Sequence, residues 1–343
     1  MKRRLNDLIA SPYFSFFVTV ALFAILYGAG IMAYKGFSRP QVFLNLFIDN
    51  AALIIVTVGI TFTLIIVGID LSVGAVLALS CMVLAWLLAN TGVSVGLAVL
   101  IVLLMGLVFG ALQGYIITKF DLQPFIITLA GMFFCRGMTA VISRDTIQIT
   151  NETFVAIASY RIDLGIGFVS VGAVLAMIVL AIAAVVLGFT KFGRTVFAIG
   201  GSESSAALMG LPVFRTKVIV YTISGFCSAL GGVAYALIML TGYNLHGLGM
   251  EMDAIASSVI GGTLLSGGVA FIPGALFGVL IQGVILTFIS FQGTLSAWWT
   301  KIVVGGLLCV FIVMQAFITE KKNKLSQKSS MEEPPSNPKP SAV

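Results

Sequence analysis

Charged residues are scarce in this sequence. Only 9% of its 343 residues are charged, 59% are hydrophobic, and the mean hydropathy is +1.12. Residues 71–118, 164–190 and 254–300 contain no charged residue. Each run exceeds the ~20 residues that an α-helix needs to cross a bilayer, and soluble domains carry far more charge. The composition therefore excludes a soluble globular protein and predicts an all-α, polytopic integral membrane protein.

Residue types that commonly carry catalysis are also few. The four cysteines lie in apolar runs without the spacing of a metal or redox site, namely Cys81, Cys135, Cys227 and Cys309. His246 is the only histidine, and we expect it to be a solvated loop residue without a partner in its own segment. The sequence lacks the dipeptide Gly-Lys and therefore has no Walker A loop. No catalytic site, metal site or cofactor is predicted.

The isolated residue Asp70 marks a predicted break in a long apolar stretch. It is one of two charged residues between Arg39 and Lys119. A continuous helix over residues 46–90 would be roughly 67 Å long, which is far more than the ~30 Å hydrocarbon core. The chain must therefore turn near Asp70. The same arithmetic over residues 254–291 predicts a second broken or re-entrant segment near 266–270.

Taking both breaks as reversals predicts about ten membrane-spanning segments. Several are shorter than a full crossing, so re-entrant segments or half-helices are expected among them, enclosed by protein or a wet cavity. The predicted segments are 14–34, 46–67, 73–90, 93–117, 124–142, 167–189, 216–240, 254–267, 270–291 and 298–318.

The positions of Lys and Arg predict the orientation of the chain. They cluster in segments that become cytoplasmic by the positive-inside rule: 2–4, 119, 191–217 and 321–324. Both termini are then cytoplasmic, with residues 1–13 before a permease-like domain over 14–319 and a disordered tail over 320–343. The formal charge of +6 fits an inner face that meets anionic lipid, and it requires no nucleic acid.

Residues 190–215 form the longest predicted internal loop, and the loop contains a helix signal. A short helix over residues 203–209 is expected to lie on the cytoplasmic face, where it must dock because it is too short to be stable alone. Lipid headgroups or a partner protein could hold it. The signals are a turn at Gly200 and Gly201, an N-cap at Ser202, an acidic first turn at Glu203, and a stop at Gly210 and Pro212.

Glycine spacing predicts closely packed helices. Gly106, Gly110 and Gly114 make two overlapping small-xxx-small steps, and Gly274 with Gly278 makes another. The triple in particular favours a tightly packed bundle.

Four motifs stand in order along the chain and carry a family resemblance. They are residues 68–74 (GIDLSVG), 124–132 (PFIITLAGM), 192–194 with 198–201 (FGR, AIGG), and 253–256 with 259–263 (DAIA, VIGGT). Over residues 40–318 the chain resembles the membrane subunits of bacterial ribose-type sugar ABC importers. Within that family, residues 261–269 and 293–302 are most similar to the second permease subunit of galactofuranose importers. Val67 departs from the family's usual glycine, and Ser202 from its usual asparagine.

The resemblance implies a division of labour in the bacterial inner membrane. A periplasmic binding protein would deliver a monosaccharide, two permease subunits would form the path, and partner ATPase subunits would use ATP. The second permease could be identical or a sister chain, and the galactofuranose resemblance suggests a sister. An ATPase-coupling loop is implied at Gly193, Arg194, Ala198, Gly200, Gly201, Ser202 and Glu203. A second motif is implied at Asp253, Gly261 and Gly262.

Asp70 has two interpretations within the helix-break motif of Gly68, Asp70, Ser72 and Gly74. It could contact a sugar hydroxyl or a coupling ion, or it could cap the helix after the break with help from Ser72. We favour the structural role, because a neutral sugar needs no buried charge. The alternative function is an ion-coupled secondary transporter of a small polar solute, for which Asp70 alone is thin support.

The sugar path itself is poorly marked in the sequence. Glu251 and Asp253 are expected to cap an external helix start. Polar and aromatic residues within the spans could meet sugar hydroxyls or could equally bond within the bundle, namely Asn50, Gln113, Tyr115 and Gln282. Substrate-binding residues are therefore left unassigned.

Overall fold

The computed structural model describes residues 14–293, 296 and 298–314. The predicted cytoplasmic N-terminus 1–13 and the tail 320–343 lie outside these residues, as do all of the N- and C-terminal lysines and arginines used for the orientation. The division into three parts therefore stays a prediction.

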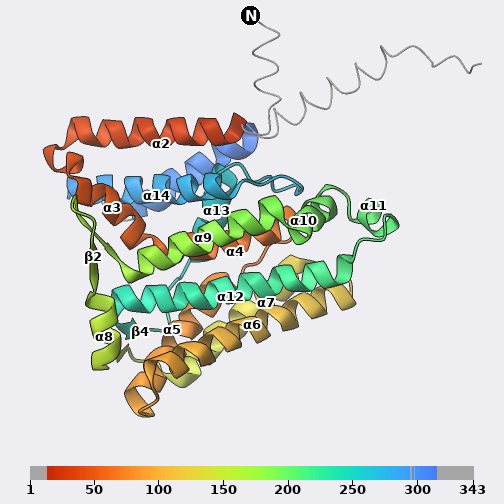
Figure 1. Cartoon of the computed structure of the whole chain (residues 1–343), viewed down its shortest axis with the longest axis horizontal. Helices are drawn as coiled ribbons and strands as arrows, with labels where there is room; N and C mark the ends of the chain where they lie inside the picture. Colours follow the sequence, from red (N-terminus) through yellow and green to blue (C-terminus); the bar gives the residue numbers. More distant parts are fainter. Residues whose placement is uncertain (1–13, 294–295, 297, 315–343) are drawn as a thin grey trace, which may run out of the picture.

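Most of the described residues of the chain are helical (Figure 1). In order, its elements are α2 (Phe14–Ala33), η1 (Lys35–Ser38), α3 (Pro40–Asp49), α4 (Ala51–Ile65), α5 (Val73–Asn90), α6 (Val95–Lys119), α7 (Pro124–Ile142), β1 (Ile147–Gln148), α8 (Glu152–Ser159), β2 (Arg161–Asp163), β3 (Phe168–Ser170), α9 (Val171–Phe189), α10 (Lys191–Gly201), α11 (Glu203–Leu208), α12 (Val213–Met239), β4 (Thr241–Gly242), α13 (Met250–Ile260), α14 (Ile272–Gln292) and a last helix, Trp298–Met314.

The all-α membrane fold is confirmed, and the count of about ten helices is approximate. Within the described residues seven helices are long and apolar enough to cross a membrane, and α3 with α4 makes an eighth if the pair is one span bent by 53°. The last helix is shorter. The predicted segment 254–267 is α13, whose 11 residues make about 16 Å, roughly half of a hydrocarbon core. This segment cannot cross the membrane as a helix.

The long helices lie side by side with their axes roughly along one direction, with α2 at one edge and α6 and α7 at the other (Figure 1). All 15 residues of α4 are buried, so this helix is apolar on every side and forms the centre. Helices α6, α7 and α9 instead expose large apolar side chains, as lipid-facing helices do. In Figure 1, α11 lies at one end of the bundle and α8 at the opposite end. We call these the α11 end and the α8 end.

The glycine triple packs α6 against α12, as its spacing predicts. A Cβ on Gly106, Gly110 or Gly114 would collide with backbone or Cβ atoms of α12. A Cβ on Gly225 of α12 would likewise collide with the backbone of α6. Gly274 and Gly278 bring α14 equally close to α13. The tightly packed bundle is therefore confirmed.

Both predicted breaks exist, and they meet. The first runs over residues 66–72 and the second over 261–271, between helices on either side. The backbone N–H of Gly268 donates a hydrogen bond of 2.9 Å to the carbonyl of Ile65. Non-helical backbone at membrane depth must find its partners inside the protein, and this bond satisfies one such pair.

A third non-helical stretch, residues 241–249, follows the side of α5. Gly242 lies against Cys81 and Ala85 near the C-terminal half of α5, and Gly247 lies against Gly74 and Leu77 near its start. The stretch thus descends roughly 11 Å along the α5 axis, at ~1.5 Å per helical residue, before α13 begins. The first turns of α5 and α13 are therefore neighbours.

Short strands cover the α8 end. β1 pairs antiparallel with β4, and β2 with β3. Residues 143–166 at this end are ordered by β1, α8 and β2.

Candidate functional site

The first break is organised around the carboxylate of Asp70. Its Oδ1 accepts hydrogen bonds from the backbone N–H of Ser72 (2.9 Å) and from the Ser72 hydroxyl (2.6 Å), and its Oδ2 accepts from the hydroxyl of Ser224 on α12 (2.7 Å). The Asp70 side chain is buried. Asp70 therefore forms a turn just before α5 and ties that turn to α12.

Two polar groups near Asp70 complete a buried polar cluster. Gln113 on α6 lies within hydrogen-bond distance of the Ser72 hydroxyl at 3.1 Å, and the Tyr221 hydroxyl lies against Gly68. Within the described residues, Gln113 Nε2 and the Tyr221 hydroxyl have no hydrogen-bond partner. Gly68 leaves space for the Tyr221 hydroxyl, because a Cβ there would collide with it.

Val67 adopts a backbone conformation that L-residues with a branched side chain rarely take. Its φ is 60°, in the left-handed region. Its side chain is 54% exposed and touches Gly267 in the second break. The position favours glycine on conformational grounds alone.

The predicted coupling loop folds into two helices at the α11 end. Thr190 caps α10 by accepting from the N–H of Gly193 (3.1 Å), and Ser202 caps α11 by accepting from the N–H of Ser205 (3.2 Å). The predicted N-cap and short helix are confirmed, and Gly210, with φ of 76°, follows the helix. The turn predicted at Gly200 and Gly201 is wrong, because both are the last residues of α10.

Gly200 is instead a point of close approach. A Cβ there would collide with the carbonyl of Ile65 and with the N–H of Gly268. The end of α10 therefore touches the backbone at the start of the first break and within the second break.

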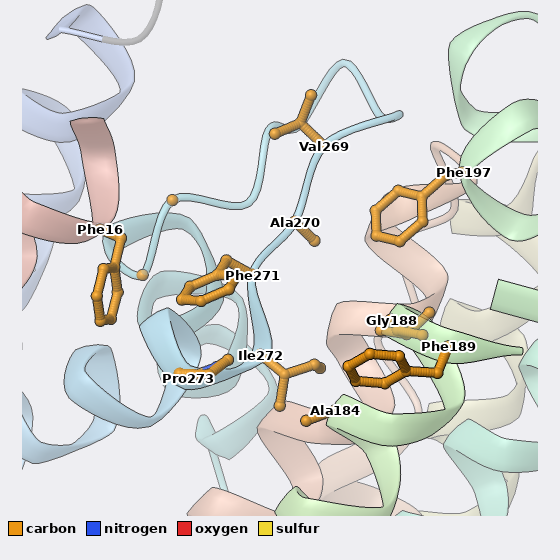
Figure 2. A pocket seen from close by; sticks show the side chains of 13 residues that line it. Phe16, Ala184, Gly188, Phe189, Phe197, Val269, Ala270, Phe271, Ile272 and Pro273 are labelled. Atoms are coloured by element: carbon orange, nitrogen blue, oxygen red, sulfur yellow. The ribbon is translucent and has the colours of Figure 1, made fainter. Parts of the chain in front are cut away.

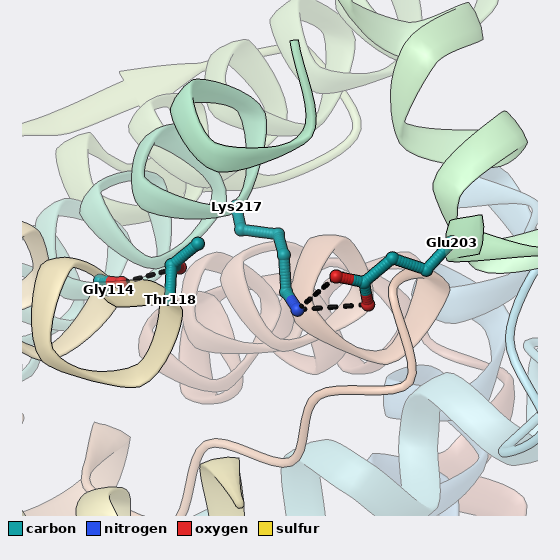
Figure 3. Close-up of polar contacts among 4 residues, drawn as sticks. All are labelled: Gly114, Thr118, Glu203 and Lys217. Atoms are coloured by element: carbon teal, nitrogen blue, oxygen red, sulfur yellow. Dashed lines mark hydrogen bonds and ion pairs between the residues drawn. The ribbon is translucent and has the colours of Figure 1, made fainter. Parts of the chain in front are cut away.

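An ion pair holds α11 to α12. Both carboxylate oxygens of Glu203 accept from Nζ of Lys217, at 2.8 and 2.9 Å (Figure 3). Figure 3 also shows the neighbouring turn of α6, where Thr118 donates to the Gly114 carbonyl (2.7 Å). Beyond this anchor, α11 presents Leu208, which is 90% exposed, and Met209, which is 67% exposed. Arg194 and Gly201 are exposed on the same loop, and Ala198 is half-buried.

The second motif lies at the two ends of α13. Asp253, in its first turn, pairs with Lys301 of the last helix. Gly261 ends α13 where its backbone touches Gly274 of α14, and Gly262 follows with φ of 101°. Glu251, also in the first turn, is 8% exposed and faces Gly74 of α5, and its Oε2 has no hydrogen-bond partner in the described part of the chain.

The prediction for Glu251 and Asp253 is partly correct. Both do stand in the first turn of a helix, whose N-cap is Gly249 with φ of 80°. The helix start, however, lies beside the first turn of α5 inside the bundle, because residues 241–249 have already descended along α5.

Arg136 on α7 is a functional candidate that the sequence interpretation missed. Its Nη1 donates to the carbonyls of Asn244 (2.9 Å) and His246 (2.7 Å), and it interacts electrostatically with Glu251. A single arginine in the otherwise uncharged span 124–142 was the available signal, since charges at membrane depth are functional candidates by default.

The prediction that His246 is solvated is wrong. Its Nε2 lies 3.1 Å from the Thr241 hydroxyl, and its ring stands edge-on between those of Tyr235 and Tyr243. These contacts form because residues 241–249 fold back against α12, where Tyr235 lies.

The other polar candidates for the sugar path have partners within the bundle. Asn50 donates to the Leu46 carbonyl (2.8 Å), and Gln282 donates to the Asp253 carbonyl (2.9 Å). Tyr115 is exposed and packs edge-on against Phe214.

One cavity of about 460 Å³ opens at the α11 end, between α2, α9, α10 and the second break (Figure 2). Figure 2 shows Phe197, Phe189 and Phe271 pointing toward it. Its side chains are all apolar, so no side chain there can hydrogen-bond to sugar hydroxyls. In the described residues no group of three or more His, Cys, Asp or Glu side chains could hold a metal ion.

Comparison with known proteins places these features in a family. The family model described as "Branched-chain amino acid transport system / permease component" matches residues 42–312. The inner membrane ABC transporter permease protein YjfF of Escherichia coli is 43% identical over 88% of this chain and 92% of its own length. The fructose import permease FruG of Bifidobacterium longum is 40% identical, over 86% and 88%.

A more distant relative is the ribose import permease RbsC of Bacillus subtilis, which is 36% identical over 88% of this chain and 91% of its own length. No solved structure matches the chain. The matched range covers both breaks, the predicted coupling loop and the second motif. The chain therefore belongs to the ABC-transporter permease family, in the branch of the ribose-type sugar import permeases, and is a membrane subunit rather than an enzyme.

Proposed function

We propose that this chain is a permease subunit of an ATP-driven importer that moves a monosaccharide delivered by a periplasmic binding protein across the bacterial inner membrane. Three of its relatives carry printed names that specify sugars: fructose, ribose and allose. ATP is used by a cytoplasmic ABC ATPase partner, and both termini are cytoplasmic. A second permease subunit, a sister chain in this proposal, forms the other wall of the path.

The observation that carries this proposal is the geometry of α11. A six-residue helix has too few hydrogen bonds to be stable alone. It is capped by Ser202, anchored by Glu203 and Lys217, and yet turns Leu208 and Met209 outward. Such a helix fits a cleft in a partner protein better than a lipid surface, because its exposed apolar area is confined to its tip. We assign α11 as the coupling helix, with the predicted residues from Gly193 to Glu203 forming the ATPase-coupling loop.

Two structural roles accompany this assignment. In the helix-break motif, Asp70 holds the turn before α5, while Gly68 and Gly74 allow Tyr221 and Glu251 to approach. In the second motif, Gly261 allows α13 and α14 to cross closely. The connection of Gly200 to both breaks gives a route by which movement of the coupling loop would reach the path.

Galactofuranose is the sugar we propose. Support comes from the sequence of residues 261–269 and of 293–302, which resemble the second permease subunit of galactofuranose importers. Binding proteins select the sugar before it reaches the membrane, so the permease need hold it only weakly.

The experiment is reconstitution of the chain in liposomes with its ATPase, its sister permease and its binding protein. We expect ATP-dependent uptake of galactofuranose and stimulation of ATP hydrolysis by the sugar-loaded binding protein. Uptake driven by a proton or sodium gradient without the ATPase would contradict the proposal and establish a secondary transporter.

A matched pair of variants tests α11 in the same liposomes. Leu208→Glu places a charge at the tip of α11 and should abolish stimulated ATP hydrolysis. Leu164→Glu places the same charge on an exposed leucine in the turn between β2 and β3, at the opposite end of the bundle, and should leave stimulation intact. Equal effects of the two variants would contradict the coupling role.

A further inference from the structure

The pair formed by Asp253 and Lys301 lies close to the middle of α14, a helix long and apolar enough to cross a membrane. Gln282 is the middle residue of the 21-residue helix α14, so its Cα lies about 15 Å from either helix end. Its side chain donates a hydrogen bond of 2.9 Å to the backbone carbonyl of Asp253. The start of α13 is therefore fixed at mid-depth, and Lys301 reaches it from the last helix.

This pair is not enclosed by its own chain. The Lys301 side chain is 47% exposed and that of Asp253 is 21% exposed. Charges exposed to lipid at this depth cost several kcal/mol, so the face that carries them must meet water or protein. By contrast Glu251, two residues earlier on α13, points inward to Gly74. The two acidic residues of the first turn thus serve different faces of the helix.

The pair also retains hydrogen-bonding capacity. Lys301 contacts Oδ2 of Asp253, and within the described residues Oδ1 and the remaining ammonium protons of Lys301 have no other partner. A carboxylate oxygen accepts from a hydroxyl, and an ammonium donates to one. The charges cancel as a pair, so a neutral solute meets no net charge there. A sugar hydroxyl, which is both donor and acceptor, matches this arrangement.

We propose that Asp253 and Lys301 form a polar contact for monosaccharide hydroxyls on the wall of the translocation path, at mid-depth, with the second permease subunit opposite. This inference rests on the proposed function for the identity of the solute, but not for the presence of water at the site. Weak contact is what a path requires, since a tightly bound sugar would not leave.

Thiol labelling tests whether the site is wet. Lys301→Cys is made in a Cys309→Ser background, because Cys309 is the exposed cysteine among the described residues. In the assembled complex we expect reaction with a charged, membrane-impermeant methanethiosulfonate reagent. Ile178→Cys, on an exposed apolar position of α9, is the lipid-facing control and should stay unlabelled. An unlabelled Lys301→Cys in an assembled complex would overturn the proposal.

Transport per ATP tests the sugar contact. Lys301→Met and Asp253→Asn should lower the sugar moved per ATP about tenfold, which corresponds to loss of one hydrogen bond to a charged group. Stimulation of ATP hydrolysis by the loaded binding protein should persist, and Lys301→Arg should retain transport. Unchanged transport in both variants would overturn the sugar contact. If the native complex moved no monosaccharide, the proposed function would fail, and labelling of Lys301→Cys would still report the wet path.

Discussion

Ser224 on α12 donates a 2.7 Å hydrogen bond to the carboxylate of Asp70, 154 residues earlier in the chain. Through this contact the isolated charge in the apolar stretch forms a joint: it links the first break to α12, the longest described helix. Because Ser72 supplies the other two hydrogen bonds, the carboxylate is satisfied without an ion.

The joint predicts how Asp70 responds to substitution. Asp70→Asn keeps one acceptor oxygen and the shape of the side chain, so it should lower the free energy of unfolding by only about 1 kcal/mol and leave transport largely intact. Asp70→Leu removes every acceptor and should prevent assembly of the complex. Uptake in liposomes and thermal unfolding in detergent measure the two effects. Complete loss of uptake by a normally assembled Asp70→Asn complex would instead indicate a chemical role for the charge.

The backbone conformation of Val67 predicts that its replacement by glycine stabilises the protein. With φ of 60°, a β-branched residue costs about 1 kcal/mol or more relative to glycine, and the exposed side chain contributes little packing in return. Val67→Gly should therefore raise the midpoint of thermal unfolding.

The matched control for this substitution is Val108→Gly, at an exposed position in the interior of α6. There glycine should lower the free energy of unfolding by about 0.5 kcal/mol, because it is the poorer helix former. A fall in the midpoint for Val67→Gly of the same size as for Val108→Gly would show that the left-handed conformation carries no strain.

Glu203 and Lys217 predict a charge-swap result. Glu203→Lys breaks the anchor of α11 and should abolish the sugar-stimulated ATPase activity of the reconstituted complex. The double variant Glu203→Lys with Lys217→Glu restores the pair and should restore the activity. Failure of the swap, with the complex intact, would indicate that Glu203 contacts the ATPase directly.

Arg194 provides the contrasting case. It is exposed and makes no ion pair with any residue in the described part of the chain. Arg194→Glu should abolish the stimulation of ATP hydrolysis. No charge-swap substitution in the described part of this chain should restore it. Unchanged stimulation would remove Arg194 from the coupling surface.

Local and length-based features of the sequence predicted much of this fold. The break at Asp70 follows from the length of an apolar run, and the cap at Ser202 follows from a serine directly before the acidic first turn at Glu203. The start of α13 could not be predicted in this way. Residues 241–249 stay non-helical through contacts with α5 and hydrogen bonds from Arg136, and both partners are distant in the sequence. The contacts of His246 and the pair of Asp253 with Lys301 likewise join residues that no sequence spacing brings together.

Gly110 predicts the sharpest test of the packing between α6 and α12. A methyl group there would collide with the carbonyl oxygen of Tyr221, a backbone atom that cannot move without displacing α12. Gly110→Ala should therefore lower the free energy of unfolding by about 2 kcal/mol. Gly137→Ala on α7 is the control, because a Cβ there meets open space, and it should unfold no earlier than the native chain. Thermal unfolding of both purified variants in the same detergent measures the difference. Equal midpoints would mean that α6 and α12 can separate freely, and the packing of Asp70, Ser224 and Tyr221 between them would then lose its support.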